Sequence, residues 1–173
     1  LQVIEAAELA SNGNTINAAG NVDVSGGTFG AGTDEVVFDG TTQLSMGSNA
    51  LYDVRIDGTA PGTVTPQDGL VVNRNFVIEN NGTYTNNSQT LTLGGTGGVA
   101  GNLTDSNGTL QDLGAVTVNT AAQTMTTAIQ ASSLTVGSSL NTGGNNLTVS
   151  GEVAVTGTLN VGGAGLVTVG GDL

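Results

Sequence analysis

Four aspartates in the N-terminal half of the chain have the residue type and the spacing that a metal site needs. Asp34 precedes Asp53, and Asp39 precedes Asp57, by nearly the same interval. If the chain winds in coils of that length, each pair places two carboxylates on neighbouring coils, roughly 5 Å apart. Carboxylate oxygens are ligands that Ca²⁺ prefers, and a bridging ion removes their mutual repulsion. We therefore predict that any Ca²⁺ binds through Asp34, Asp39, Asp53 and Asp57.

An ordinary acidic surface is the competing interpretation of the same residues. The carboxylates can fan apart into water, with Arg55, between Asp53 and Asp57, offsetting part of their repulsion. The nonapeptide repeat that binds Ca²⁺ in other solenoids, Gly-Gly-x-Gly-x-Asp, does not occur in the chain. The sequence leaves both interpretations open.

The balance of charge disfavours several classes of function. The chain has 14 Asp and Glu residues but only two basic residues, Arg55 and Arg74, which gives a net charge of -12. Such a charge argues against nucleic acid and anionic membranes as partners. Because there is no Lys or His to act as a base, we expect no enzyme, no catalytic residue and no bound cofactor.

Short apolar–polar–apolar triplets recur along the chain and indicate the elements that hold these residues. Leu91 and Leu93 flank Thr92, and a period of two is typical of a half-buried strand. One series of triplet centres recurs about once every 20 residues. Its members are Val37, Val54, Val71, Thr92, Thr117, Thr135 and Ala154. Strands this short bury their apolar side only by stacking into a common interior.

The spacing therefore predicts an all-β fold: a single-domain parallel β-helix over residues 1–173, right-handed, with about 8–9 coils of roughly 20 residues. Thr117 and Thr135 face solvent in this fold. The interior is lined by apolar residues of the triplets: Val116, Val118, Leu134, Val136, Leu147 and Val149. The 29 Gly residues supply turn conformations, and the presence of only two Pro leaves the N–H groups of the strand ladders intact.

Two segments depart from the plain repeat. Residues 1–33 are the least regular, and we interpret them as N-terminal coils of looser pattern. Residues 58–69 hold both prolines and predict a loop that leaves the rod.

Two further segments predict how the chain turns between strands. In residues 50–57 the alternation predicts one strand whose Tyr52, Val54 and Ile56 face the interior. A straight strand over residues 70–78 would bury the charge of Arg74, so we predict a corner at residues 73–75.

Three stretches resemble a known class of protein. They are VSGGTFGAGTDEVVFDGTTQ at 24–43, LYDVRIDG at 51–58, and GLVVNRNFVIENNGTYTNNSQTLTLGG at 69–95. They are similar to the Gly/Thr/Asn-rich repeats of large secreted bacterial surface proteins, the adhesin-like and autotransporter-passenger-like β-solenoids. The resemblance extends from about residue 20 onward and implies a β-solenoid on or outside the cell. Such solenoids serve as stalks, adhesins, filaments and sheaths, so the resemblance assigns no catalytic residue.

The ends of the chain suggest how such a solenoid would be used. The repeat continues to the last residues without a polar cap, and a terminal coil without a cap exposes its strand edges. We expect the ends to meet through apolar residues: Leu1, Val3, Ile4, Leu166, Val167 and Val169. The result is an extracellular structural protein, a head-to-tail homopolymer that forms a filament or sheath through open ends or strand donation. The alternative is a stalk or adhesin segment of a larger surface protein, which binds glycan or another surface through residues 58–69.

Overall fold

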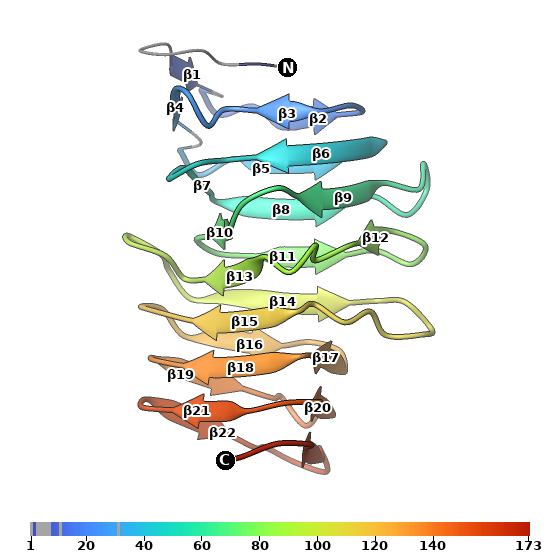
Figure 1. Ribbon diagram of the computed structural model, residues 1–173, viewed down its shortest axis with the longest axis vertical. Helices are drawn as coiled ribbons and strands as arrows, with labels where there is room; N and C mark the ends of the chain where they lie inside the picture. Colours follow the sequence, from blue (N-terminus) through green and yellow to red (C-terminus); the bar gives the residue numbers. More distant parts are fainter. Residues whose placement is uncertain (1, 3–7, 11, 31) are drawn as a thin grey trace.

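The computed structural model describes residues 2, 8–10, 12–30 and 32–173 of the chain. Within these residues the structure is all-β without a helix, and its strands stack in parallel as a single β-solenoid of about 8 turns. Figure 1 shows the strands stacked along the long axis, with the N-terminus at one end and the C-terminus at the other. The predicted fold class is confirmed.

Two long sheets run along the rod. Sheet C consists of β2 (Ile16–Ala18), β5 (Glu35–Phe38), β8 (Asp53–Ile56), β11 (Phe76–Ile78), β14 (Gly101–Asp105), β16 (Gln123–Met125), β19 (Ser139–Asn141) and β22 (Thr158–Asn160). Sheet D consists of β7 (Ala50–Leu51), β10 (Leu70–Val72), β13 (Thr90–Leu93), β15 (Ala115–Val118), β18 (Ser133–Val136) and β21 (Val153–Val155). Each coil contributes one strand to sheet C.

Three shorter sheets complete the wall. Sheet A, in the N-terminal coils, consists of β3 (Val22–Asp23), β6 (Thr41–Ser45), β9 (Thr63–Pro66) and β12 (Thr83–Tyr84). Sheet E, in the C-terminal coils, consists of β17 (Ile129–Ala131), β20 (Leu147–Val149) and β23 (Val167–Val169). Sheet B is the pair β1 (Glu8–Ala10) and β4 (Thr28–Gly30). In Figure 1 the chain descends while the more distant β5 and β8 run to the right and the nearer β6 and β9 run to the left, so the coil is right-handed.

The register of sheet C shows that the coils differ in length. One inward-facing column runs through paired residues: Ile16, Val36, Val54, Phe76, Leu103 and Met125. Along this column the step from Val36 to Val54 is the shortest, and the step from Phe76 to Leu103 is the longest. Because the strands keep their register while the connections vary in length, insertions are absorbed at the corners and leave the interior straight.

The interior matches the sequence prediction. The six residues predicted to line it have exposed fractions between 0% and 3%: Val116, Val118, Leu134, Val136, Leu147 and Val149. Thr117 is half-buried and Thr135 is exposed on the outer face of sheet D. The assignment of inner and outer faces is confirmed in these coils.

The predicted series of triplet centres is correct for one sheet and wrong at its beginning. Sheet D pairs its centres in one column: Val71, Thr92, Thr117, Thr135 and Ala154. Val37 and Val54, however, lie in sheet C, where Val37 pairs with Arg55. Because sheets C and D both carry the apolar triplet, its spacing alone does not say which sheet a triplet joins.

The two predicted turning segments have different outcomes. The corner at residues 73–75 is confirmed, because β10 ends at Val72 and β11 begins at Phe76. The single strand over residues 50–57 is wrong, because the chain turns at Tyr52 between β7 and β8. Leu51 and Val54 are both buried although their positions have opposite parity, and a flat strand cannot place two such residues on one face.

The N-terminal segments are more regular than the sequence indicates. Within residues 12–30, β2, β3 and β4 already form a coil. The prediction of a loop over residues 58–69 is wrong for Thr63–Pro66, which is β9 and pairs with β6. Pro66 is the last residue of that strand, where its missing N–H interrupts the ladder least.

Asparagine side chains join the coils where the strand ladders are interrupted. Asn21 Oδ1 accepts a hydrogen bond from Gln43 N at 3.0 Å, and Asn75 Oδ1 accepts one from Asn102 N at 2.9 Å. Asn49 Nδ2 donates to three carbonyls, those of Val24, Gly27 and Met46. Backbone groups at the corners are thereby satisfied without a strand, which explains why the chain is rich in Asn.

Candidate functional site

The predicted metal ligand Asp53 is engaged by an arginine. The residue is 7% exposed, and its Oδ1 accepts hydrogen bonds from Arg74 Nε at 2.8 Å and from Asn75 N at 3.0 Å. Arg74 Nη2 also binds Asp53 Oδ2. The register places Asp53 beside Glu35. Asp34 and Asp53 therefore lie on adjacent coils as predicted, with Asp53 N donating to the Asp34 carbonyl at 3.3 Å, but they are one residue out of register.

The carboxylates of the other three predicted ligands do not join this ion pair. Asp34 Oδ2 accepts a hydrogen bond from Gly13 N at 2.8 Å. Asp57 Oδ1 accepts from Thr59 N at 2.7 Å and from Thr59 Oγ1 at 2.8 Å, and these bonds lower the pKa of Asp57. Asp39 Oδ1 is buried and has no hydrogen-bond partner among the described residues.

Of the four predicted calcium ligands, Asp39 and Asp57 are the pair whose predicted placement is supported. Asp39 and Asp57 directly follow the paired residues Phe38 and Ile56, so they are neighbours on adjacent coils as predicted. Among the residues that the structure describes, no group of three or more His, Cys, Asp or Glu side chains is placed to hold a metal. Calcium binding stays a prediction, now confined to the pair Asp39 and Asp57.

Arg55 neutralises part of the acidic surface across three coils. Its Nε lies 3.3 Å from Glu35 Oε1, and its Nη1 lies 3.2 Å from Glu79 Oε1. The sequence suggests Asp53 and Asp57 as its neighbours, but Asp53 binds Arg74 and Asp57 accepts its hydrogen bonds from Thr59. The coils above and below Arg55 supply its carboxylates instead.

A shallow polar groove lies beside the second arginine. It is lined by Arg74, Asn75, Ala100, Gly101, Asn102 and Thr124. The guanidinium carbon of Arg74 lies 4.6 Å from the centre of the Tyr52 ring, within the range of a cation–π contact. The groove therefore combines amide, hydroxyl and guanidinium groups next to a half-buried aromatic residue.

The C-terminal end of the rod presents strand edges and apolar side chains. Sheets D, C and E end at β21, β22 and β23, and within the described part of the chain each of these strands pairs on one side only. Val155 is 40% exposed, Val161 47% and Leu166 63%. By contrast Val136, which pairs with Val155 one coil earlier, is fully buried. The last coil thus exposes residue positions that earlier coils bury.

The residues predicted to form the assembly ends fall into two groups. Leu166 is exposed, whereas Val167 and Val169 are half-buried in β23 against the interior. Leu1, Val3 and Ile4 lie outside the described residues.

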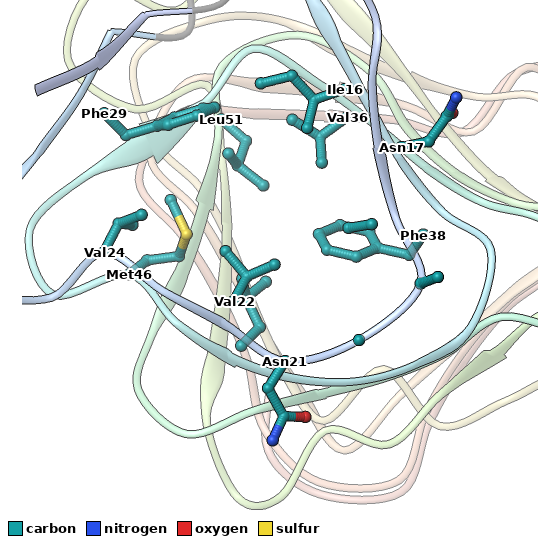
Figure 2. Close-up of a pocket in the computed structure, with 14 residues that line it drawn as sticks. Ile16, Asn17, Asn21, Val22, Val24, Phe29, Val36, Phe38, Met46 and Leu51 are labelled. Atoms are coloured by element: carbon teal, nitrogen blue, oxygen red, sulfur yellow. The ribbon is translucent and has the colours of Figure 1, made fainter. Parts of the chain in front are cut away.

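An apolar cavity lies at the N-terminal end of the interior. It has a volume of about 230 Å³ and is lined by residues of the first coils. Figure 2 shows the side chains of Ile16, Val22 and Phe38 pointing into the space that the coils enclose, whereas Asn17 and Asn21 point away from it. The interior of these first coils therefore leaves an unfilled apolar space.

One feature missed by sequence reasoning, the pair Asp53 and Arg74, had a usable signal. The two residues are opposite charges 21 residues apart, about one coil, which is the spacing of stacked neighbours. The cavity carried no such signal, because the residues that line it follow the same apolar pattern as the other coils.

Comparisons with protein-family models, curated proteins and solved structures found no match for this chain. Within its described residues, none of the chain forms a helix long and apolar enough to cross a membrane. The described residues form a parallel β-solenoid.

Proposed function

We propose that this β-solenoid is an extracellular structural protein, a subunit that joins head to tail into a filament or sheath. One observation carries the proposal: the last strands of three sheets keep open edges beside exposed apolar residues such as Val161 and Leu166. An open parallel edge is a template for another strand, and a second copy supplies strands of the same spacing.

The C-terminal coils lack the usual devices that protect an edge. Both prolines lie before residue 67, and the only charged residues after Asp112 are Glu152 and Asp172. Charges and prolines are what soluble sheets commonly place at their edges to prevent pairing. Their scarcity here leaves these edges able to pair with further strands, as the proposed assembly requires.

The acidic surface of the N-terminal part of the chain favours separate filaments over bundles of filaments. Twelve of the 14 acidic residues lie in residues 1–112, and the two arginines are bound to carboxylates of the same chain. Acidic surfaces repel one another laterally. The proposed location outside the cell rests on the resemblance of residues 24–43 and 69–95 to repeats of secreted surface proteins.

The assembly is tested by blocking one end. Val161→Asp introduces a charge at the exposed end of the interior, whereas Thr135→Asp adds the same charge to the exposed outer face of β18, which is paired on both sides in sheet D. We expect sedimentation velocity to show concentration-dependent polymers for the natural chain and for Thr135→Asp, and monomers for Val161→Asp. A monomeric natural chain at every concentration contradicts the proposal, provided that circular dichroism shows folded β-structure.

The polar groove beside Arg74 favours a second candidate function, a stalk or adhesin segment that binds glycan. Planar amides and an aromatic ring next to a guanidinium are groups that hydrogen-bond and stack on sugars. Asn102 is exposed in this groove. Binding of neutral and acidic glycans that is lost in Asn102→Ala but kept in Asn160→Ala supports this function, and no binding by the natural chain rejects it.

A further inference from the structure

We infer that the polar groove beside Arg74 binds a neutral, linear oligosaccharide that lies along the rod, across β11, β14 and β16. This inference rests on the second candidate function, glycan binding, and specifies the class of glycan and its orientation. Asn102 and Thr124 are the residues that we expect to hydrogen-bond to successive sugar units. The three strands lie in the middle of the stack, and each pairs on both sides in sheet C (Figure 1).

The groove follows one outward column of sheet C. Asn102 pairs with Thr124, and Asn102 N donates to Asn75 Oδ1 at 2.9 Å. Successive residues of such a column are about 4.8 Å apart along the rod. From Asn75 to Thr124 the column therefore spans about 10 Å. This length exceeds one sugar ring, so a ligand of at least two sugar units is needed to fill the groove.

Two side chains of this column are free to bind a ligand. In the part of the chain that the structure describes, neither the amide of Asn102 nor the hydroxyl of Thr124 has an internal hydrogen-bond partner. Their neighbours in the column are occupied: Oδ1 of Asn75 by a backbone N–H, and Oδ1 of Asn141 by Gly143 N at 2.9 Å. An amide and a hydroxyl can each donate and accept hydrogen bonds, and so can the hydroxyls of a sugar.

A long corner leads into the floor of the groove. Residues 94–100 connect sheets D and C before β14, whereas the coils before and after use the shorter connections 73–75 and 119–122. The long connection leads into Gly101, which lines the groove. A Cβ on Gly101 would collide with the carbonyl oxygen of Arg74. The backbones of two coils therefore meet closely here, and the floor is main chain.

The charge of the groove favours a neutral ligand. Of the described residues that line it, only Arg74 is charged, and Asp53 binds its guanidinium. Beyond Asp53 the same column continues to Glu35, and the whole chain has a net charge of -12. An acidic glycan would thus meet no uncompensated positive charge in the groove and a negative field around it.

Isothermal titration calorimetry of the folded chain with defined sugars tests the ligand class. The neutral probes are cellohexaose, maltohexaose and xylohexaose, each with its monosaccharide, and the acidic probe is hexagalacturonate. We expect at least one neutral hexasaccharide to bind and hexagalacturonate to give no binding. The matching monosaccharide should bind about 2- to 10-fold more weakly, because it reaches only one of the two free side chains.

Three threonine-to-valine variants test the orientation. Thr124→Val removes a hydroxyl from the groove and should lower the affinity about 2- to 10-fold. Thr104 lies on the same strand as Asn102, where a glycan crossing the rod would reach, and its Oγ1 already bonds Thr126 Oγ1. Thr104→Val should therefore bind as the natural chain does. Thr135→Val, on the outer face of sheet D, is the control away from the groove.

The outcomes separate the inference from the second candidate function. Neutral binding that Thr124→Val weakens and that Thr104→Val leaves unchanged supports the inference. Equal affinity for the monosaccharide overturns the linear ligand, weakening by Thr104→Val overturns the orientation, and hexagalacturonate binding that is lost in Asn102→Ala overturns the neutral class. Each of these results leaves glycan binding at the groove intact. Binding that no groove variant weakens, or no binding of any probe by a chain that circular dichroism shows to be folded, overturns both.

Discussion

Arg74 and Asp53 bind each other across the boundary between two coils. Arg74 Nε donates to Asp53 Oδ1 at 2.8 Å, and the aspartate is only 7% exposed. The corner at residues 73–75 brings the guanidinium out of the interior and over this carboxylate. A straight strand would bury the charge of Arg74, whereas the corner lets Arg74 form an ion pair that links two successive coils.

Loss of this link should destabilise the fold. Arg74→Ala leaves the buried Asp53 without its charged partner, and an unsatisfied buried acceptor costs about 1–3 kcal/mol. We expect urea unfolding to show that loss. Arg55→Ala is the matched control, because its partners Glu35 and Glu79 are about one-third exposed and such pairs contribute about 0–1 kcal/mol. Equal losses in the two variants contradict this assignment.

The interior column should be sensitive to truncation. Leu134 is 3% exposed between Val116 and Val153 of the neighbouring coils. Leu134→Ala should lower the free energy of unfolding by about 2–5 kcal/mol, the range for large-to-small core changes. Thr135→Ser, on the exposed face of the same strand, should cost far less. Similar losses at both sites would mean that the faces of β18 are reversed.

Acid should weaken the turns that aspartates hold. Hydrogen bonds from Ser25 to Asp23 and from Thr59 to Asp57 lower the pKa of each aspartate from its ordinary value of 3.8. Their contribution to stability is therefore present above pH 3.8 and lost as pH falls through the lower, folded-state pKa. Urea unfolding between pH ~6 and pH ~2.5 should show less acid dependence for Asp57→Asn than for the natural chain. An unchanged profile would contradict this role of Asp57.

Calcium, if it binds, should act through Asp39 and Asp57. An ion held only by the folded chain raises the melting temperature. Asp39→Asn should abolish a Ca²⁺-dependent rise, whereas Asp34→Asn should keep it, because Asp34 lies apart and binds Gly13 N. A melting curve that is unmoved by millimolar Ca²⁺ and by chelator rejects the site.

The repeat pattern predicted the fold because it is a local consequence of the pleat. Leu91 and Leu93 must share a face, and their equivalents one coil away must stack on them, so Val116 and Val118 could be placed from the sequence. Corners are harder, because a turn changes the parity of the alternation by one residue, as at Tyr52.

Contacts between coils are harder still, because they depend on coil lengths that vary along the rod. Glu35 and Arg55 are neighbours on adjacent coils and lie 20 residues apart in the chain, whereas Asn75 and Asn102 are neighbours 27 residues apart. The spacing of 21 residues between Asp53 and Arg74 was therefore compatible with stacked neighbours but did not by itself select this pair.

The candidate site was less predictable for the same reason. The choice between Asp34 and Glu35 as the neighbour of Asp53 depends on a register difference of one residue. Spacing in the sequence does not resolve such a difference when loops of different length lie between the strands.

The central claim, that the sheets continue from one copy into the next, is tested most directly by electron cryomicroscopy of material assembled from the 173-residue chain. The account predicts unbranched filaments in which the strands on the two sides of each junction lie about 4.8 Å apart, the ordinary spacing of paired strands. Filaments built through side-by-side contacts of sheet faces, or only dispersed monomers at high concentration, would contradict it.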